Sequence, residues 1–202
     1  MIVTDIKSLL LHLNELCTNA LQGAAGLSVS RTHYEVTVEH LLLKLLEDDR
    51  SDWSIIFQKF NLDVGRFRRL LEEVLENLQR GNSGRPVFSP MLIDLVQDSW
   101  VVASIDLVEK KIRSGAIMLA MLSRPGFYAT GSYIDMIKQI NRDELIKEFW
   151  AITKESKETV IREGTPEERI EEGRAEDKGF LGQFCIDFTQ RARDGKIDPV
   201  FG

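Results

Sequence analysis

Several features that would identify a particular class of protein are scarce in this 202-residue chain. It holds only two cysteines, Cys17 and Cys185, which lie far apart in the sequence. A disulfide framework or a structural zinc site needs more ligands at closer spacing, so both thiols are expected to be reduced. Basic residues form no cluster and the formal net charge is −6, which argues against a nucleic-acid partner.

Long apolar runs are missing as well. No segment approaches the roughly 20 apolar residues that a membrane span needs. The first 13 residues carry Asp5, Lys7 and His12 among their apolar residues and have no small-residue cleavage site, unlike a signal peptide. These features predict a cytoplasmic protein with no membrane partner.

Catalytic motifs are also absent from the sequence. It contains no G-x-x-x-x-G-K-[ST] phosphate loop and no H-E-x-x-H, C-x-x-C or G-x-S-x-G motif. The three histidines do not share a metal-ligand spacing, and His40, inside an apolar helix, is better interpreted as a packed or capping residue than as a base. A nucleophile pair of Cys17 with a distant histidine is a weak alternative. Neither catalysis nor a bound metal is expected.

The dominant positive feature is an internal repeat. The run V-T-V-E-H-L-L-L-K-L-L at residues 36–46 returns as I-R-S-G-A-I-M-L-A-M-L at residues 112–122. A shift of 117 − 41 = 76 places Leu41 on Ile117 and also Leu16 on Leu92, so a pair of helices repeats. Self-similarity of this length predicts a duplicated structural unit.

Apolar residues recur at helical spacing along most of the first 153 residues, so the fold class is predicted to be all-α. Asn14, Thr37 and Ser89 are expected to cap helices, and Gly26 is expected to end the second helix. Later helices match with a shift of 141 − 61 = 80, which pairs Asn141 with Asn61. The prediction is two four-helix repeats related by a pseudo-twofold axis, with an extra helix at residues 2–13.

Composition divides the chain into three parts. Residues 1–153 form the helical domain, and residues 154–179 are rich in alternating charges, as expected of a solvated linker. Residues 180–202 become apolar again and are interpreted as the start of a following domain.

Binding is the function that remains. The extra helix at residues 2–13 either caps the bundle or forms one wall of a groove, and the residues alone leave both possibilities open. An apolar groove between helices is a receptor for an amphipathic partner helix.

The sequence F-C-I-D-F-T-Q-R-A-R-D-G-K-I-D-P-V-F-G at residues 184–202 resembles the entry to the first ATPase domain of Clp/Hsp100 AAA+ unfoldases. The doubled helical module and charged linker before it resemble their N-terminal domain. Within that group, residues 20–47 and F-S-P-M-L at residues 88–92 are similar to the ClpV (TssH) family of type VI secretion. The extra first helix also fits ClpV better than the disaggregase ClpB.

This resemblance implies a recruitment module that binds an N-terminal amphipathic helix of the large sheath subunit, VipB (TssC), in an apolar groove. The ATPase domains would then disassemble the contracted sheath. ATP, magnesium and the hexamer belong to those domains, beyond Gly202, so no cofactor is expected here. The alternative is a general chaperone N-domain that captures unfolded or aggregated polypeptides. The expected groove residues are Ile6, Leu10, Leu13, Leu16, Cys17 and Ala20 on one side and Phe88, Met91, Leu92 and Val96 opposite.

Overall fold

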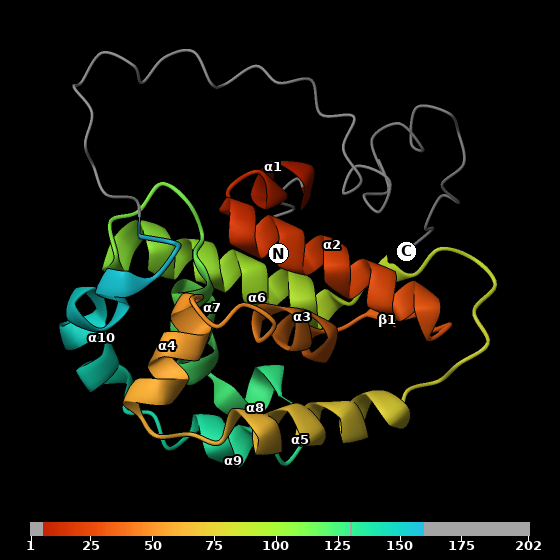
Figure 1. Ribbon diagram of the computed structural model, residues 1–202. Coiled ribbons are helices and arrows are strands. Elements are labelled where there is room, and N and C mark those ends of the chain that lie inside the picture. The colour runs from red at the N-terminus through yellow and green to blue at the C-terminus, as the bar shows by residue number, and fades with distance from the viewer. Residues whose placement is uncertain (1–5, 130, 160–202) are drawn as a thin grey trace, which may run out of the picture.

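Short apolar helices make up the described part of the chain, residues 6–129 and 131–159 of this computed structural model (Figure 1). In chain order the elements are α1 (Ile6–Leu10), α2 (Glu15–Ser30), β1 (Glu35–Val36), α3 (Val38–Leu45), α4 (Asp52–Lys59), α5 (Val64–Glu76), β2 (Val87–Phe88), α6 (Pro90–Val101), η1 (Val102–Asp106), α7 (Ser114–Ser123), α8 (Pro125–Tyr128), α9 (Ile134–Ile137), α10 (Arg142–Ile152) and η2 (Thr153–Glu155). The all-α prediction is confirmed. Among these residues, no helix has the length and apolar character needed to cross a membrane.

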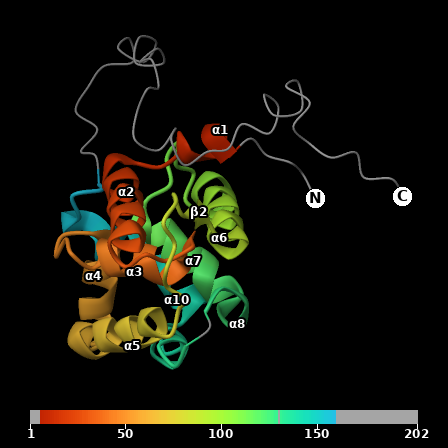
Figure 2. The ribbon, with the colours of Figure 1, turned by 90° about the vertical axis from the view of Figure 1, so that its right-hand side faces the viewer.

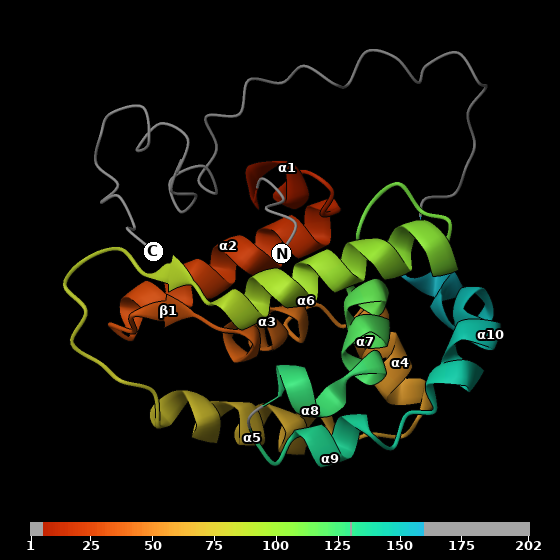
Figure 3. The same cartoon turned by 180° about the vertical axis from the view of Figure 1, so that it is seen from behind.

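Two short backbone pairings join the halves of the repeat. Strands β1 and β2 are parallel and pair Glu35 with Val87 and Val36 with Phe88. Leu13 and Ile112 form a second parallel bridge. Both pairings lie just before a helix begins, so the starts of the repeated helices are held side by side. Figure 3 shows α2 and α6 running together across the molecule, with α3 and α7 beneath them.

The predicted N-caps at Asn14, Thr37 and Ser89 are confirmed. They also correct the register of the repeat. The caps of α2 and α6 differ by 89 − 14 = 75 positions, whereas those of α3 and α7, Thr37 and Arg113, differ by 113 − 37 = 76. The uniform shift of 76 was therefore wrong for the first helix pair.

A π-helical turn accounts for this difference. Beyond α6 the chain forms η1, in which the Leu107 N–H donates to the Val102 carbonyl five residues earlier, at 3.1 Å. A π turn contains one residue more than an α turn, so the second repeat accommodates one extra residue before α7. With a shift of 75, Cys17 corresponds to Leu92, and both are buried.

The expected helix end at Gly26 was also wrong. Helix α2 continues to Ser30 and is capped at Arg31. A Cβ added at Gly26 would meet nothing within 4 Å, so this glycine lies at an open position inside the helix. Packing of the flanking apolar residues Ala24 and Ala25 in the core outweighs the weak helix propensity of one glycine.

Helix α4 and the start of α9 each contact the leucine-rich helix of the other repeat, α7 and α3 respectively. The backbone N–H of Trp53 in α4 donates to Ser114 Oγ at the start of α7, at 3.2 Å. The Tyr133 hydroxyl, at the start of α9, donates to Glu39 Oε1 in α3, at 2.7 Å. The halves therefore interlock across the pseudo-twofold axis. Figure 2 shows α5 and α9 closing the far end of the molecule from α1.

The pairing of Asn141 with Asn61 does not hold in the structure. The Asn141 side chain caps α10 by accepting from the Asp143 and Glu144 N–H groups, at 3.0 and 3.1 Å. Its counterpart is therefore Asp63, which caps α5 by accepting from the Arg66 N–H at 2.9 Å.

The packed module extends beyond the predicted linker boundary at residue 153. Residues 156–159, which we call the strap, lie against the helices: the Lys157 N–H donates to the Arg50 carbonyl at 3.0 Å, and Lys157 Nζ lies 2.7 Å from Asp48 Oδ2. The rest of the predicted linker and the predicted start of a following domain lie outside the described residues.

Candidate functional site: an apolar crevice beneath the first helix

Helix α1 covers the surface between α2 and α6 and encloses an apolar crevice. Every residue that lines it is hydrophobic: Ile6, Leu9, Leu10, Leu21, Phe88, Leu92, Ile93 and Val96. The crevice has a volume of only about 10 Å³, so it is closed rather than preformed for a large side chain. An all-apolar lining at a helix junction suits the apolar face of another helix.

The junction after α1 is anchored to the second repeat. The Asn14 N–H donates to the Ile112 carbonyl at 2.9 Å, the Ile112 N–H donates to the His12 carbonyl at 2.6 Å, and the His12 ring stacks on Trp100 with centroids 3.9 Å apart. Helix α1 itself has only five residues, too few to be stable without tertiary contacts. Its position therefore depends on the burial of Leu9 and Leu10.

The opposite wall begins at Phe88. The Ser89 N–H donates to the Val36 carbonyl at 3.0 Å, which fixes the end of β2. Ser89 then caps α6 by accepting from the Leu92 N–H, and Pro90 occupies the first helical turn, where its missing N–H costs no hydrogen bond. These local features place Phe88 at the mouth of the crevice, with Val87 beside it 43% exposed.

The structure divides the ten expected groove residues among different places. Five of them line the crevice: Ile6, Leu10, Phe88, Leu92 and Val96. Leu16 and Ala20 lie on another face of α2, in a separate hollow. Leu13 and Cys17 are buried in the core, and Met91 packs against that core; these three line neither opening.

Three crevice residues were missed at the sequence level: Leu9, Leu21 and Ile93. Leu9 lies three residues after Ile6, and Ile93 lies three residues before Val96. Helical spacing alone would therefore have placed both residues on the same helix faces as the predicted ones. Which side of α2 faces α1 was not visible in the pattern, because α2 carries apolar residues on more than one side.

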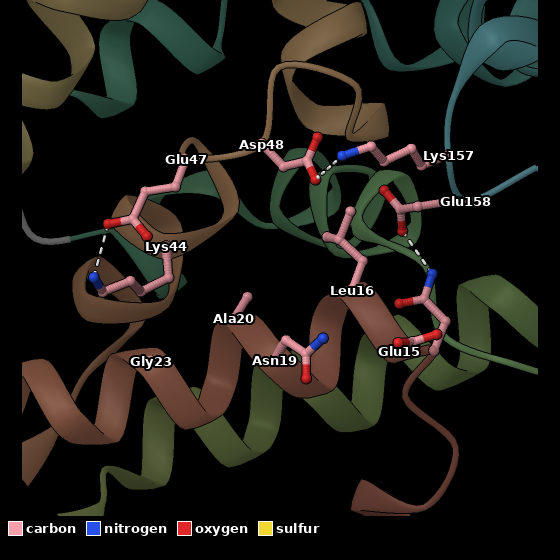
Figure 4. Close-up of a pocket in the computed structure, with 11 residues that line it drawn as sticks. Glu15, Leu16, Asn19, Ala20, Gly23, Lys44, Glu47, Asp48, Lys157 and Glu158 are labelled. Atoms are coloured by element: carbon pink, nitrogen blue, oxygen red, sulfur yellow. Dashed lines mark hydrogen bonds and ion pairs between the residues drawn. The ribbon is translucent and has the colours of Figure 1, made fainter.

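The separate hollow lies between α2, the end of α3 and the strap (Figure 4). Its volume is about 750 Å³, and its lining residues are Asn14, Glu15, Leu16, Asn19, Ala20, Gly23, Lys44, Glu47, Asp48, Lys157 and Glu158. Lys44 Nζ is 2.7 Å from Glu47 Oε1, and Lys157 pairs with Asp48. Two ion pairs thus flank a small apolar floor.

A buried polar cluster lies behind this hollow. Arg113 Nε and Asp52 Oδ2 are 2.5 Å apart, and both side chains are almost fully buried. Glu158 of the strap accepts from the Asp52 N–H at 2.8 Å, the Ser114 N–H at 2.7 Å and Asn14 Nδ2 at 2.7 Å, as well as from the Ser114 hydroxyl. One carboxylate therefore bonds the starts of α4 and α7 and the cap residue of α2.

The burial and pairing of these groups fit a structural role better than a catalytic one. Burial, followed by the charges of Glu158 and Asp52, raises the pKa of the Cys17 thiol well above its ordinary value, so thiolate formation is disfavoured. Burial, followed by the charge of Asp52, also raises the pKa of Glu158, although hydrogen bonds from Ser114 and the Asp52 N–H oppose the change. Within the described residues, no group of His, Cys, Asp and Glu side chains is arranged to hold a metal ion.

Comparison with known proteins gives a consistent result. The family model described as "Clp repeat (R) N-terminal domain" matches residues 12–130. The chain is 29% identical to the chaperone protein ClpB of Yersinia enterocolitica over 206 residues, covering 97% of this chain and 23% of the relative. The chain therefore spans about a quarter of the length of that curated relative.

Solved structures give a more specific likeness. The N-domain of ClpV from Vibrio cholerae is 34% identical, with a TM-score of 0.74 over 79% of this chain and 95% of that one. A structure described as a complex of the ClpV N-domain with a VipB peptide is also 34% identical, with a TM-score of 0.72 over 79% of this chain and 98% of that one.

Proposed function

Because the chain belongs to the Clp repeat N-terminal domain family and has the fold of the ClpV N-domains, we propose that it is the substrate-recruitment domain of a type VI secretion unfoldase. In this proposal it binds an N-terminal helix of the large sheath subunit, VipB (TssC), in the cytoplasm. ATPase domains of the full-length protein, assembled as a hexamer with ATP and magnesium, would then disassemble the sheath.

The observation that carries this proposal is the wholly apolar crevice beneath α1. It joins residues from four elements, α1, α2, β2 and α6, and has no polar side chain in its lining. A helix whose side chains repeat at i, i+3, i+4 and i+7 presents the complementary surface. The ClpV N-domain in complex with a VipB peptide supports the choice of partner.

The closed state of the crevice suggests how binding proceeds. A volume of about 10 Å³ cannot accept a leucine side chain, so α1 must shift for the partner helix to enter. That shift moves a helix of only five residues, and its main cost is the lost burial of Leu9 and Leu10. The partner helix then replaces contacts that α1 makes in the free domain.

Substitution of a crevice residue tests this function. Ile6→Glu places a charge in the crevice wall at a half-buried position and should weaken binding of a fluorescent sheath-subunit N-terminal peptide by roughly 10-fold or more, as measured by fluorescence anisotropy. Leu11→Glu, at the exposed residue that follows α1, is the matched control and should leave the affinity within about 3-fold. Equal losses in both variants would place the binding site elsewhere.

A second candidate function is capture of unfolded polypeptides, favoured by the 29% identity to ClpB over nearly the whole chain. A scrambled peptide of the same composition separates the two functions. The recruitment function requires the native order of apolar residues, so the scrambled peptide should bind much more weakly. Similar affinities for both peptides would support the general chaperone function.

A further inference from the structure

The side of α6 that lines the crevice continues beyond it to Trp100. Ile93 and Val96 are crevice residues, and Trp100 lies seven positions after the first and four after the second, still inside the helix. Seven residues of an α-helix complete two turns to within about 20° and advance about 10.5 Å. Trp100 therefore lies on the same side of α6 as Ile93, two turns farther along, and it is half-buried.

A histidine ring covers this tryptophan. The His12 ring stacks on the Trp100 indole with ring centroids 3.9 Å apart and an interplanar angle of 20°. His12 lies two residues beyond the end of α1, and α1 itself packs on α6. The first helix and the residue after it thus cover one continuous strip of α6: α1 covers the crevice, and the His12 ring covers the indole.

The His12 ring can leave this place while its main chain stays fixed. The His12 carbonyl accepts from the Ile112 N–H at 2.6 Å, and the next residue, Leu13, forms a parallel bridge with Ile112. The ring is joined to this anchored junction by rotatable side-chain bonds. Rotation of the ring therefore exposes Trp100 at the cost of one stacking contact, and the start of α2 does not have to move.

We propose that Trp100 is a further anchor for the sheath-subunit helix, and that the His12 ring occupies the place of a partner side chain in the free domain. The role given to Trp100 rests on the proposed function and extends its site along α6. A helix that lies along α6 with one apolar side chain at Ile93 places its i+7 side chain at Trp100, because both helices advance equally per residue. The domain then selects a partner whose apolar residues recur over two full turns.

The chemistry of the indole suits this role. Tryptophan offers a large, rigid apolar face, and it is enriched among the residues that dominate the energetics of protein interfaces. The apolar surface also continues past it, because Val101, the next residue, is 51% exposed. Replacement of the half-buried His12 ring by an apolar partner side chain removes more of this surface from water, which favours the bound state.

Substitution of Trp100 tests the anchor. Trp100→Ala should weaken binding of the fluorescent sheath-subunit N-terminal peptide by roughly 10-fold or more, as measured by fluorescence anisotropy. Trp100→Leu retains an apolar side chain and a good helix former, so it should fold and weaken binding by about 3-fold to 10-fold. The matched control is Trp150→Ala, which removes a tryptophan that is 46% exposed on α10, a helix outside the crevice. Its affinity should stay within about 3-fold of wild type.

His12→Ala separates a binding role of Trp100 from a purely structural one. If the ring competes with the partner for the indole, its removal should raise the peptide affinity by about 3-fold or more, because a larger fraction of the free domain has Trp100 uncovered. In the Trp100→Leu background the same change should alter the affinity by less than about 2-fold, since the stacking contact is already lost. A purely structural stack predicts that neither change raises the affinity.

Wild-type affinity in both Trp100 variants would overturn the proposal, as would a His12→Ala variant whose affinity does not rise. Circular dichroism checks that each variant is folded, and Trp100→Leu decides the outcome if Trp100→Ala does not fold. Ile6→Glu, measured alongside, separates this proposal from the proposed function. A loss of affinity in Ile6→Glu but in neither Trp100 variant would leave the crevice as the binding site and remove Trp100 from it, whereas no loss in any of the three would overturn both.

Discussion

The two repeats have the same core and different surroundings. In both, a helix capped by Asn14 or Ser89 precedes a leucine-rich helix, and the buried residues coincide once the π turn is taken into account. Helix α1 covers the seam between the two repeats, where it packs on α6. The first repeat is open at the hollow, whereas in the second repeat α8 packs on α6 and α7. The duplicated part provides the core, and the unduplicated parts create the surfaces available for binding.

The repeats also differ in the polar groups at the start of the leucine-rich helix. In the first repeat, Thr37 caps α3, and its N–H donates to His40 Nδ1 at 3.0 Å. In the second, the equivalent of Thr37 is Arg113, which forms a buried ion pair with Asp52. At the start of α7 the Ser114 N–H donates to Glu158 at 2.7 Å and the Gly115 N–H donates to Asp52 Oδ2 at 3.3 Å. The start of one leucine-rich helix is therefore bonded by neutral groups and the start of the other by carboxylates.

Removal of Arg113 should cause the largest loss of stability and the largest difference between the two repeats. Arg113→Leu leaves Asp52 buried beside Glu158 without its cation, and we expect a loss of about 3–5 kcal/mol in the free energy of unfolding, measured by urea denaturation. Thr37→Ala, the equivalent change in the first repeat, should cost about 1 kcal/mol. Equal losses would mean that the ion pair contributes no more than an ordinary cap.

Acid should destabilise the first repeat through its histidine pair. His33 Nδ1 and His40 Nε2 are 2.9 Å apart; burial, followed by nearby positive charge, lowers the pKa of both, and that of His40 falls from 6.5 to about 3. As the pH falls, these histidines are therefore protonated at a higher pH in the unfolded chain than in the folded one. The free energy of unfolding should fall as pH drops below about 6.5, by roughly 3 kcal/mol between pH 7 and pH 4.

His40→Gln supplies the comparison for this pH dependence. Glutamine at this position can still accept from the Thr37 N–H in a capping box, but it does not titrate. The difference in the free energy of unfolding between wild type and variant should follow the histidine titration, and the titration of Glu158 cancels because both proteins contain it. The equivalent residue in the second repeat is Ala116, which does not titrate. If the free energy of unfolding of His40→Gln depends on pH in the same way as that of the wild type, the histidine pair is not the source of the acid sensitivity.

Two glycines should respond in opposite directions to substitution by alanine. A Cβ at Gly115 would lie 2.6 Å from the Phe149 ring and 2.9 Å from Asp52 Oδ2. Gly115→Ala should therefore cost about 1–3 kcal/mol through overpacking. At Gly26, where the space is open, Gly26→Ala should stabilise the domain by about 0.5–1 kcal/mol. Thermal denaturation of the two variants decides this, and a stabilised Gly115→Ala would contradict the close contact.

Sequence periodicity predicted the elements that depend on local signals. The caps at Asn14, Thr37 and Ser89 and the burial of the leucine-rich run follow from residue type and spacing within one helix turn. The one-residue change in register could not be seen, because η1 has no sequence signature that separates it from an ordinary helical turn. The role of Glu158 was also hidden, since a glutamate in a charged segment looks solvated until the chain folds back.

The candidate site was only partly predictable for a related reason. Ile6, Leu10, Phe88, Leu92 and Val96 belong to helices whose apolar residues converge on one crevice. Leu16 and Ala20 have the same character but face another side of α2, and Cys17 faces the polar cluster. A helix that contacts several neighbours has more than one apolar side, and only tertiary structure tells which neighbour each side meets.

The bonding of Glu158 has a mechanical consequence. Traction applied to the chain beyond Thr159 reaches Glu158 before it reaches a helix end, because the strap follows η2 (Thr153–Glu155) along the chain. The load then divides among the Asp52 and Ser114 N–H groups and the Asn14 side chain, which belong to different helices of both repeats. Several hydrogen bonds must break together in shear, so the domain resists being peeled apart one helix at a time when its own linker is pulled.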